Sequence, residues 1–437
     1  MASIATNSSI ASVNQLDLFT LPETQGTVEK TTYVDKRTIT SNPNDSPLEF
    51  NIPESGHDFI DLQNSKLEIK LKIKNGKGSL IRTDVVGPIN LLLQSLWSQI
   101  DIFMNNTRVS DASTNYAYRA YIPTILSYGT EVKCTSLLSQ LFVKDVGGMD
   151  AVVGTGNKGL SERSLYTSLS KVVHLIGPLY SDIWKINRWI IPGVSLNLAL
   201  WRNNDNFLLM TSNLEKNYNI EIIEAKLIVC YCTLQQPAYL AFEAALSLSP
   251  VRYPLIKTEV KNYSLPKDAT DKTYEDVFAG KIPTKVVVAF VSDEAYHGSR
   301  TKNPFNFYHN DASFIGLYQN GIPVPGRAFQ PKFNGKDKEN AECVDCFDAL
   351  FSFAGKSPLG TSIDINRDDF SDGYSFFVFN LEHLLTAKTN VLPLYKNGNL
   401  RLEIKFRKKL EESIQVLVYA QFPYILKIQK NREVVLE

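Results

Sequence analysis

A glycine-rich segment has the spacing of a phosphate-binding loop. Gly154, Gly156 and Gly159 match the pattern G-x-G-x-x-G. The backbone N–H groups of such a loop cradle a pyrophosphate when a buried strand precedes it and an apolar helix follows it. Residues 151–153 make a poor strand here, and residues 160–164 are mostly polar. The surrounding chain also lacks the alternation of strands and helices that this site requires, so we predict a flexible loop.

Two further motifs for phosphate and calcium are incomplete. The G-K-S sequence at 355–357 resembles the end of a P-loop, but Leu350 stands where the first glycine must be, and the phosphate nest cannot form without it. The acidic segment 364–369 begins like a calcium loop. Its sixth position is Asp369 rather than glycine and its twelfth is Ser375 rather than glutamate. We predict a chance match for the first motif and an acidic turn for the second.

Five cysteines and five histidines are the candidate ligands for a metal. Cys343 and Cys346 have ligand spacing, but a structural zinc site needs a second pair or histidine partners. Cys230 and Cys232 lie two residues apart on a predicted strand, which puts both side chains on one face. The histidines are scattered along the chain at His57, His174, His297, His309 and His383. We therefore predict ordinary packing for these side chains, with no metal, no cofactor and no catalytic residue.

A basic stretch near the C-terminal end is a candidate for contact with nucleic acid or an acidic partner. Its cations are Lys396, Arg401, Lys405, Arg407, Lys408 and Lys409. Glu411 and Glu412 follow closely, and most charge runs are solvated faces of an element. We interpret the stretch as a solvated face and predict no sequence-specific binding of nucleic acid.

The elements that must position these residues are mostly strands. Residues 67–74 alternate strictly between aliphatic and charged side chains, the pattern of a half-buried strand. Further β-patterned runs lie at 98–104, 171–179, 194–201, 207–210, 218–234, 255–263, 284–291, 314–318, 374–380, 400–406 and 413–424. Helical patterns lie at 116–128, where Pro123 limits the length, and at 161–170, 237–248 and 339–353. Many short strands with few long helices indicate sandwiches or barrels.

One strand pair occurs twice in the chain. A turn glycine and an alternating strand at 193–200 are followed by a second strand at 222–231, and the same two elements recur at 398–406 and 413–419. The two turn glycines lie about 205 residues apart, which is nearly half the chain. A repeat at this distance predicts a duplicated β domain, each copy ending in the same strand pair.

Length and composition exclude several classes of protein. The chain has 437 residues, which at roughly 150 residues per domain predicts two or three domains, or two large β domains. The 46 Lys+Arg balance 46 Asp+Glu, and this zero net charge argues against a protein that wraps nucleic acid through bulk electrostatics. The 23 Phe and 20 Tyr favour half-buried sheets. An odd number of cysteines, five, indicates a reduced compartment.

No targeting or membrane segment is predicted. The first nineteen residues have neither an early Lys or Arg nor an apolar core, so they are not a secretory signal. No charge-free stretch reaches the roughly 18 residues that a membrane helix needs. These observations predict a chain without a membrane span.

Three blocks of sequence resemble a known family. The block 87–102 (GPINLLLQSLWSQIDI), followed by Asn105 and by 116–121 (YAYRAY), resembles the major capsid proteins of Polinton (Maverick) elements and adintoviruses. The block 191–198 (IPGVSLNL) resembles a second part of that family, and the ending from Val418 to Val435 resembles a third. Together the blocks sample the chain from residue 87 to its end, in the order of the family. The N-terminal arm and the loop before residue 160 lie outside the resemblance.

The resemblance implies an all-β double jelly roll, with two eight-stranded antiparallel β-sandwiches in one chain and short inserted helices. The predicted parts are a flexible N-terminal arm at 1–28, a first jelly roll at 29–236, a connector at 237–250 and a second jelly roll at 251–437. Members of the family have no catalysis and form pseudo-hexameric homotrimers that tile the icosahedral shell of a virion. The expected partners are therefore further copies of the chain, penton proteins and minor capsid proteins.

Two other functions of a jelly roll remain open. A ligand-binding module, lectin-like or receptor-binding, needs a cluster of Asp, Asn or aromatic residues on its loops, and none stands out. An enzyme of the cupin type needs clustered His and carboxylate ligands, which scattered histidines do not supply. A homotrimer favours the capsid role, whereas a stable monomer that binds glycan or metal favours one of these alternatives.

Overall fold

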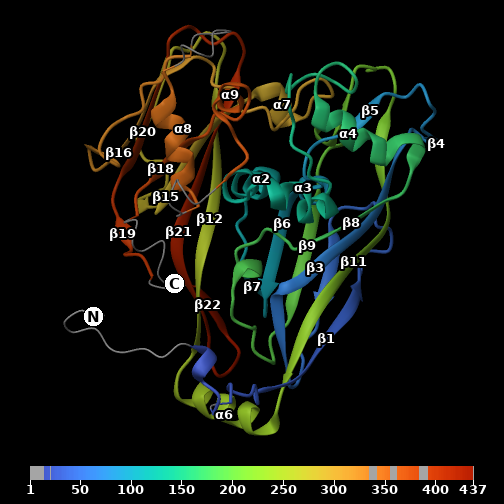
Figure 1. The fold of residues 1–437 in the computed structure, drawn as a ribbon, viewed down its shortest axis with the longest axis vertical. Helices are drawn as coiled ribbons and strands as arrows, with labels where there is room; N and C mark the ends of the chain where they lie inside the picture. The colour runs from blue at the N-terminus through green and yellow to red at the C-terminus, as the bar shows by residue number, and fades with distance from the viewer. Residues whose placement is uncertain (1–13, 20, 334–341, 355–361, 383–391, 437) are drawn as a thin grey trace.

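Two lobes built mostly from strands lie side by side (Figure 1). The structure is a computed structural model and describes residues 14–19, 21–333, 342–354, 362–382 and 392–436. The first half of the chain, drawn in blue to green, forms one lobe, and the second half, drawn in yellow to red, forms the other. Helix α6 (Gln236–Leu248) joins the lobes at one end of the molecule.

Among the described residues of the first half, two main sheets contain nine strands, eight of which have a counterpart in the second half. These eight strands are β1 (Val28–Arg37), β2 (Leu48–Ile52), β3 (Asp58–Asn75), β6 (Trp97–Met104), β7 (Thr107–Arg108), β8 (Val173–Gly177), β9 (Leu196–Arg202) and β11 (Tyr218–Leu234). In the large sheet β11 pairs with β1 and β3, and β3 pairs with β8. The small sheet has the order β2-β9-β6-β7, and all these pairs are antiparallel.

The described residues of the second half also contribute nine strands to two main sheets, and eight of them match those of the first half. These eight strands are β12 (Val251–Leu265), β13 (Asp271–Tyr274), β15 (Lys285–Ser292), β16 (Ala312–Gln319), β17 (Ile322–Pro323), β18 (Phe377–Asn380), β20 (Leu400–Phe406) and β21 (Ile414–Ile428). In this large sheet β21 pairs with β12 and β15, and β15 pairs with β18. The small sheet has the order β13-β20-β16-β17.

The two halves have the same topology. Along the chain, the eight matched strands of each half enter the sheets in the order large, small, large, small, small, large, small, large. Antiparallel strands connected in this order across two sheets form a jelly roll, so the predicted fold class is confirmed. The strand pair that occurs twice in the sequence is also confirmed, because β9 and β20 hold one equivalent place and β11 and β21 hold another. The domain boundaries drawn from the sequence stay a prediction.

Side-chain alternation explains why β3 lies at the centre of its sheet. The aliphatic residues at the odd positions from Leu67 to Ile73 are fully buried. The charged residues between them lie on the other face, where Lys70 Nζ is 2.8 Å from Glu224 Oε2 of β11. A partly exposed ion pair contributes about 0–1 kcal/mol, whereas each buried aliphatic side chain contributes about 1.5–3 kcal/mol. Burial therefore sets the position of the strand.

Short helices and strands complete the fold. The ninth strand of each half is β4 (Gly78–Ser79), which pairs with β3, or β22 (Val434–Leu436), which pairs with β21. The other strands form two short pairs, β5 (Val86–Pro88) with β10 (Leu209–Thr211) and β14 (Lys281–Ile282) with β19 (Lys396–Asn397). The remaining α-helices are α1 (Leu92–Ser95), α2 (Tyr116–Ser127), α3 (Thr130–Cys134), α4 (Lys158–Thr167), α5 (Asp205–Leu208), α7 (Asp293–His297), α8 (Val344–Ala349) and α9 (Arg367–Ser371). Within the described residues, no helix is long and apolar enough to span a membrane.

The helix predicted at 116–128 is found at Tyr116–Ser127. Pro123 does not limit its length, because packing on nearly all sides of the helix outweighs the lost backbone hydrogen bond. Two other element predictions are wrong in detail. The strand predicted at 207–210 begins as α5, whose N-cap Asn204 accepts a hydrogen bond from the backbone of Asn206. The helix predicted at 339–353 is shorter, since α8 starts at Val344, and residues 339–341 lie outside the described residues.

Candidate functional site: the seam between the two lobes

The first-half segment between β7 and β8 fills the space between the lobes. It contains α2, α3 and α4, and Figure 1 shows α2 and α3 between the two sets of strands. Every residue of α2 except Ser127 is buried, although no single sandwich encloses the helix. We use the term seam for the contacts that residues 115–182 make with the second half.

A fully buried ion pair lies in the seam. Arg163 Nη2 is 2.8 Å from Asp145 Oδ1, and both side chains are 0% exposed. Arg163 also donates to the carbonyl oxygens of Pro88 at 3.0 Å and Val143 at 2.6 Å. From the second half, Asn303 Nδ2 donates to Asp145 Oδ2 at 3.2 Å. A buried pair is stable only when its remaining polar atoms have hydrogen-bond partners, and these contacts supply them.

A second buried ion pair of the first half lies against the edge of the other lobe. Arg119 Nη2 lies 2.7 Å from Asp182 Oδ2. The backbone N–H of Thr258, on edge strand β12, donates to the same Asp182 oxygen at 3.0 Å. Two residues along β12, the carbonyl of Val260 accepts a hydrogen bond from Asn115 Nδ2 at 3.2 Å. The first half therefore pairs backbone groups of β12 that the sheet itself leaves free.

The acidic turn that begins like a calcium loop belongs to the seam. Asn366 and Asp369 form a capping box at the start of α9, as each side chain accepts the backbone N–H of the other residue. Asp369 Oδ2 is also 2.8 Å from Lys144 Nζ, and Asp364 Oδ1 accepts a hydrogen bond from Thr130 at 2.9 Å. The predicted acidic turn is confirmed, and its carboxylates connect the two halves.

One lysine of the seam is buried and has a lowered pKa. Burial lowers the pKa of Lys133 to about 7. Its Nζ donates to the carbonyl oxygen of Ile125 at 2.9 Å and to that of Ile363 in the second half. A lowered lysine pKa is typical of catalytic lysines, but this group is 2% exposed and bonded to two carbonyls. The contacts indicate a structural role.

Aromatic rings complete the seam. Tyr121 of α2 stacks on Phe305 of the second half with ring centroids 4.0 Å apart and an interplanar angle of 2°. Tyr118, also on α2, stacks on Tyr296 at 5.7 Å and 9°. Such pairs add about 0.5–1.5 kcal/mol beyond the area that they bury. Ion pairs, hydrogen bonds and ring contacts together hold the lobes in one relative orientation.

The glycine-rich segment ends beside the seam. The side chain of Asn157 caps α4 by accepting the backbone N–H of Leu160 at 3.0 Å. A Cβ atom at Gly159 would lie 2.3 Å from the carbonyl oxygen of Lys144. The third glycine therefore permits close packing of α4 on the preceding loop. The sequence prediction of a loop missed that its last two residues begin a helix.

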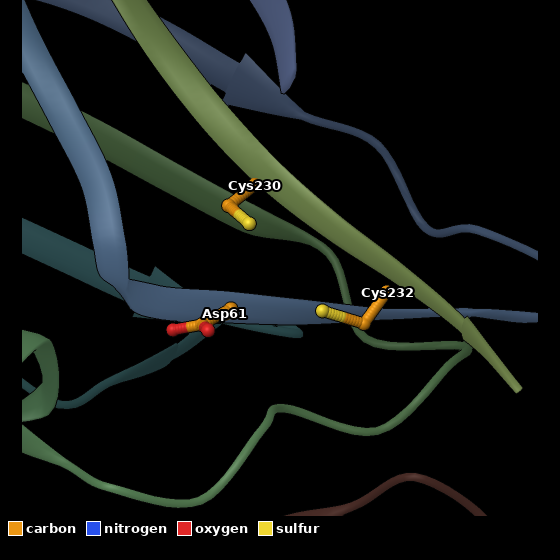
Figure 2. A group of neighbouring side chains, drawn as sticks. All are labelled: Asp61, Cys230 and Cys232. Atoms are coloured by element: carbon orange, nitrogen blue, oxygen red, sulfur yellow. The ribbon is translucent and has the colours of Figure 1, made fainter. Parts of the chain in front are cut away.

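One group of three potential metal ligands occurs among the described residues. Figure 2 shows Asp61 of β3 beside Cys230 and Cys232 of β11, with ligand atoms all within 4.8 Å of one another. Asp61 already accepts hydrogen bonds from Asn64 Nδ2 at 2.8 Å and Trp189 Nε1 at 3.2 Å. Burial raises the pKa of Cys230 to about 11 and also raises that of Cys232, which keeps both thiols protonated at neutral pH. These contacts favour the predicted packing role.

The other candidate ligands lie apart. Cys343 and Cys346 are buried at the start of α8, and burial raises the pKa of both thiols. Neither belongs to a group of three potential ligands within the described residues, nor do the four histidines that the structure describes. His383 and the G-K-S sequence at 355–357 lie outside the described residues.

The basic stretch lies on and around β20. Lys405 Nζ is 3.0 Å from Glu403 Oε1 and 5.2 Å from the ring centre of Phe314. The guanidinium of Arg401 lies 4.5 Å from the ring centre of Tyr318. These cations already have anionic or aromatic neighbours on their own sheet, which favours the interpretation as a solvated face.

Comparison with known sequences gives one full-length likeness. None of the known protein-family models matches the chain. A Caenorhabditis elegans protein described as uncharacterized is 24% identical over 407 residues, which cover 90% of this chain and 94% of that protein. The likeness spans both halves, so the two chains share their overall length and order.

Comparison with solved structures gives the fold. A protein of the Sputnik virophage matches with a TM-score of 0.63 at 14% identity, covering 100% of this chain and 94% of the other. The PBCV-1 virus capsid matches with a TM-score of 0.57 at 10% identity and coverages of 96% and 98%. The faustovirus major capsid protein matches with a TM-score of 0.54 at 8% identity and coverages of 93% and 92%. The chain therefore has the double jelly-roll fold that is found in these viral capsid structures.

Proposed function

We propose that the chain is a structural major capsid protein that forms pseudo-hexameric homotrimers, which tile an icosahedral viral shell. The observation that carries this proposal is the pair of jelly rolls with identical topology in one chain. Three such chains contain six similar sandwiches, so a trimer fills a six-fold lattice position. A cyclic trimer is a closed assembly whose internal contacts saturate.

The seam supports the proposal because a shell subunit must keep one shape. Two buried ion pairs of the first half, Arg163–Asp145 and Arg119–Asp182, each accept a hydrogen bond from the second half, and stacked rings add to these contacts. Buried charge pairs tolerate little misplacement, since a displaced partner leaves an uncompensated charge in a dry environment. Two sandwiches fixed in this way act as one rigid building block.

The charge balance also supports the proposal. The 46 cationic and 46 anionic residues sum to zero, so copies of the chain meet without a large like-charge penalty. Contacts between trimers are then expected to be small and repeated, which suits surfaces of mixed polarity.

The finer assignment is to the Polinton (Maverick) and adintovirus type. It rests on the three sequence blocks that resemble this family. The full-length likeness to a nematode protein fits an element of this kind, which can be integrated in a host genome. Penton and minor capsid proteins are the proposed partners besides further copies of the chain, and the virion is the proposed location.

Electron microscopy of the purified full-length chain tests the proposal. Negatively stained samples are expected to show particles of hexagonal outline with three-fold symmetry, or closed shells. A uniform population of small monomers that binds glycan or metal in a fixed ratio would contradict the capsid role and favour a ligand-binding module.

A further inference from the structure

The edge strand of the large sheet is covered in one half of the chain and bare in the other. β12 is the edge strand of the second half, and Thr258 and Val260 within it are 2% and 3% exposed. β1 is the equivalent strand of the first half, and all its residues from Glu29 to Asp35 are exposed, Tyr33 at 62%. Bare backbone groups on an edge strand are a template for contact with another chain.

The sequence of β1 leaves its middle open for such a contact. Charged residues occupy both ends of the strand, at Glu29–Lys30 and at Asp35–Arg37. Charges of this kind protect an edge from indiscriminate pairing. The four residues between them, Thr31–Val34, are uncharged, so this short segment is the part of the edge that a specific partner can cover.

Within the chain, the β6–β7 hairpin contacts β22 and the turn before it, at the end of β21 that pairs with the start of β12. Asn105 at its tip donates through Nδ2 to the carbonyl oxygen of Arg432 at 2.9 Å. Thr107 on β7 donates to the carbonyl oxygen of Val434 at 3.5 Å. Together with Asn115 and Asp182, which bond to β12 itself, the hairpin covers this side of the second lobe.

The equivalent hairpin of the second half has the same geometry but no cover. Asn105 and Asn320 are the tip residues, and both have a left-handed backbone, with φ of 43° and 51°. Each side-chain oxygen accepts a backbone N–H at 2.8 Å, from Ser195 in one half and Asn399 in the other. In the second half the tip is exposed from Asn320 onwards, and Ile322 is 67% exposed.

We propose that the β16–β17 hairpin of one copy docks beside β1 of a second copy, as the β6–β7 hairpin and the segment that follows it dock on the β12 and β22 end of the second half within each chain. The inference rests on the proposed homotrimer and names its contact surface. The surfaces that meet are different, so the contact is heterologous, and three copies close it into a ring. The contact between two copies then resembles the contact between the two halves of one chain.

Charge substitutions on the two surfaces test the contact. Thr32→Asp on β1 and Ile322→Asp on the hairpin each place a carboxylate in the junction, where it loses its hydration. Each variant is expected to raise the dissociation constant of the wild-type trimer about tenfold or more in sedimentation equilibrium. Leu214→Asp is the matched control, because Leu214 is 66% exposed on a different loop, and it is expected to leave the constant unchanged.

The possible outcomes separate this inference from the proposed function. A wild-type chain that stays monomeric at all concentrations contradicts the homotrimer, and this contact with it. If the wild-type chain forms a trimer and both aspartate variants form it with the same dissociation constant, only the contact is contradicted and the capsid role stands.

Cross-linking gives a second readout with milder substitutions. Cys134, the exposed cysteine of the described chain, is first replaced in all proteins as Cys134→Ser. Thr32→Cys and Ile322→Cys copies are then mixed and treated with a short bismaleimide. A cross-link that joins the two kinds of copy is expected. A cross-link that forms between Thr32→Cys copies alone would show a two-fold contact of β1 with itself and overturn the inference.

Discussion

Asp145 and Arg163 have no exposed surface, yet both side chains belong to charged residue types. Moving two ions out of water costs several kcal/mol each, and their mutual attraction offsets that cost only when the geometry is good. Asn303 adds a hydrogen bond from the second half at 3.2 Å. At the scale of single residues, this buried pair of the first lobe therefore also anchors a contact to the second lobe.

Removing one charge of this pair should destabilise the protein strongly. Arg163→Met leaves Asp145 buried without its cation, so the free energy of unfolding is expected to fall by about 3–5 kcal/mol in chemical denaturation. Arg327→Ala is the control, because Arg327 and Asp345 form an ion pair that is 79% and 65% exposed, and about 1 kcal/mol or less is expected. Equal losses for both variants would contradict the importance of the buried pair.

Acid should destabilise the protein through His309. Burial lowers the pKa of His309 to about 4, and its Nδ1 accepts the backbone N–H of Asp311 at 2.9 Å. In the unfolded chain His309 takes up a proton near pH 6.5, whereas in the folded chain it does so only near pH 4. The free energy of unfolding is therefore fully retained above pH 6.5. It falls as the pH drops towards 4, by up to about 1.4 kcal/mol per pH unit. Asn at this position keeps a hydrogen-bond acceptor but does not titrate. The free energy of unfolding of the His309→Asn protein should therefore fall less between pH 6.5 and pH 4 than that of the wild type. Parallel pH profiles of the two proteins would contradict this account.

These residue contacts could not be predicted from the sequence. The partners Asn303 and Asp145 are 158 residues apart, and nothing in the residue types marks them as neighbours. The acidic segment 364–369 was recognisable as a turn, but its cation Lys144 comes from the other half. The missing information is how the two lobes pack, which no local pattern encodes.

At the scale of elements, periodicity was the informative signal. The strands predicted at 218–234 and 400–406 have the observed limits, because strict alternation of buried and exposed positions leaves only one register in a sandwich. Helix α2 was also predicted within one residue of its observed limits, but Pro123 does not shorten it. The second lobe packs against the helix, and tertiary packing overrides propensity there.

A single methyl group should disturb the docking of α4. Gly159→Ala favours the helix by about 1 kcal/mol in propensity, but the added Cβ would lie 2.3 Å from the carbonyl oxygen of Lys144. The clash is the larger effect, and a net loss of about 1–3 kcal/mol in unfolding free energy is expected. Gly56→Ala is the control, since nothing lies within 4 Å of its added Cβ. A more stable Gly159→Ala protein would contradict the packing role of this glycine.

At the scale of the whole molecule, each chain has two edge strands on which a neighbouring jelly roll can pack. Each half has an edge strand on its large sheet, and the chain covers β12 but leaves β1 bare. A monomer therefore has one satisfied junction and one open one. Association of further copies is the arrangement in which every jelly roll has equivalent neighbours.

Light scattering on the purified full-length chain tests the central claim most directly. The chain mass is 49.1 kDa, and the account predicts a particle of about 147 kDa, three times that mass, whose contacts saturate so that its mass stays constant as the concentration rises. Salt is expected to have little effect on the trimer, because a zero net charge leaves little repulsion to screen. A stable species of about 49 kDa over the whole concentration range would contradict the homotrimer and the capsid function built on it.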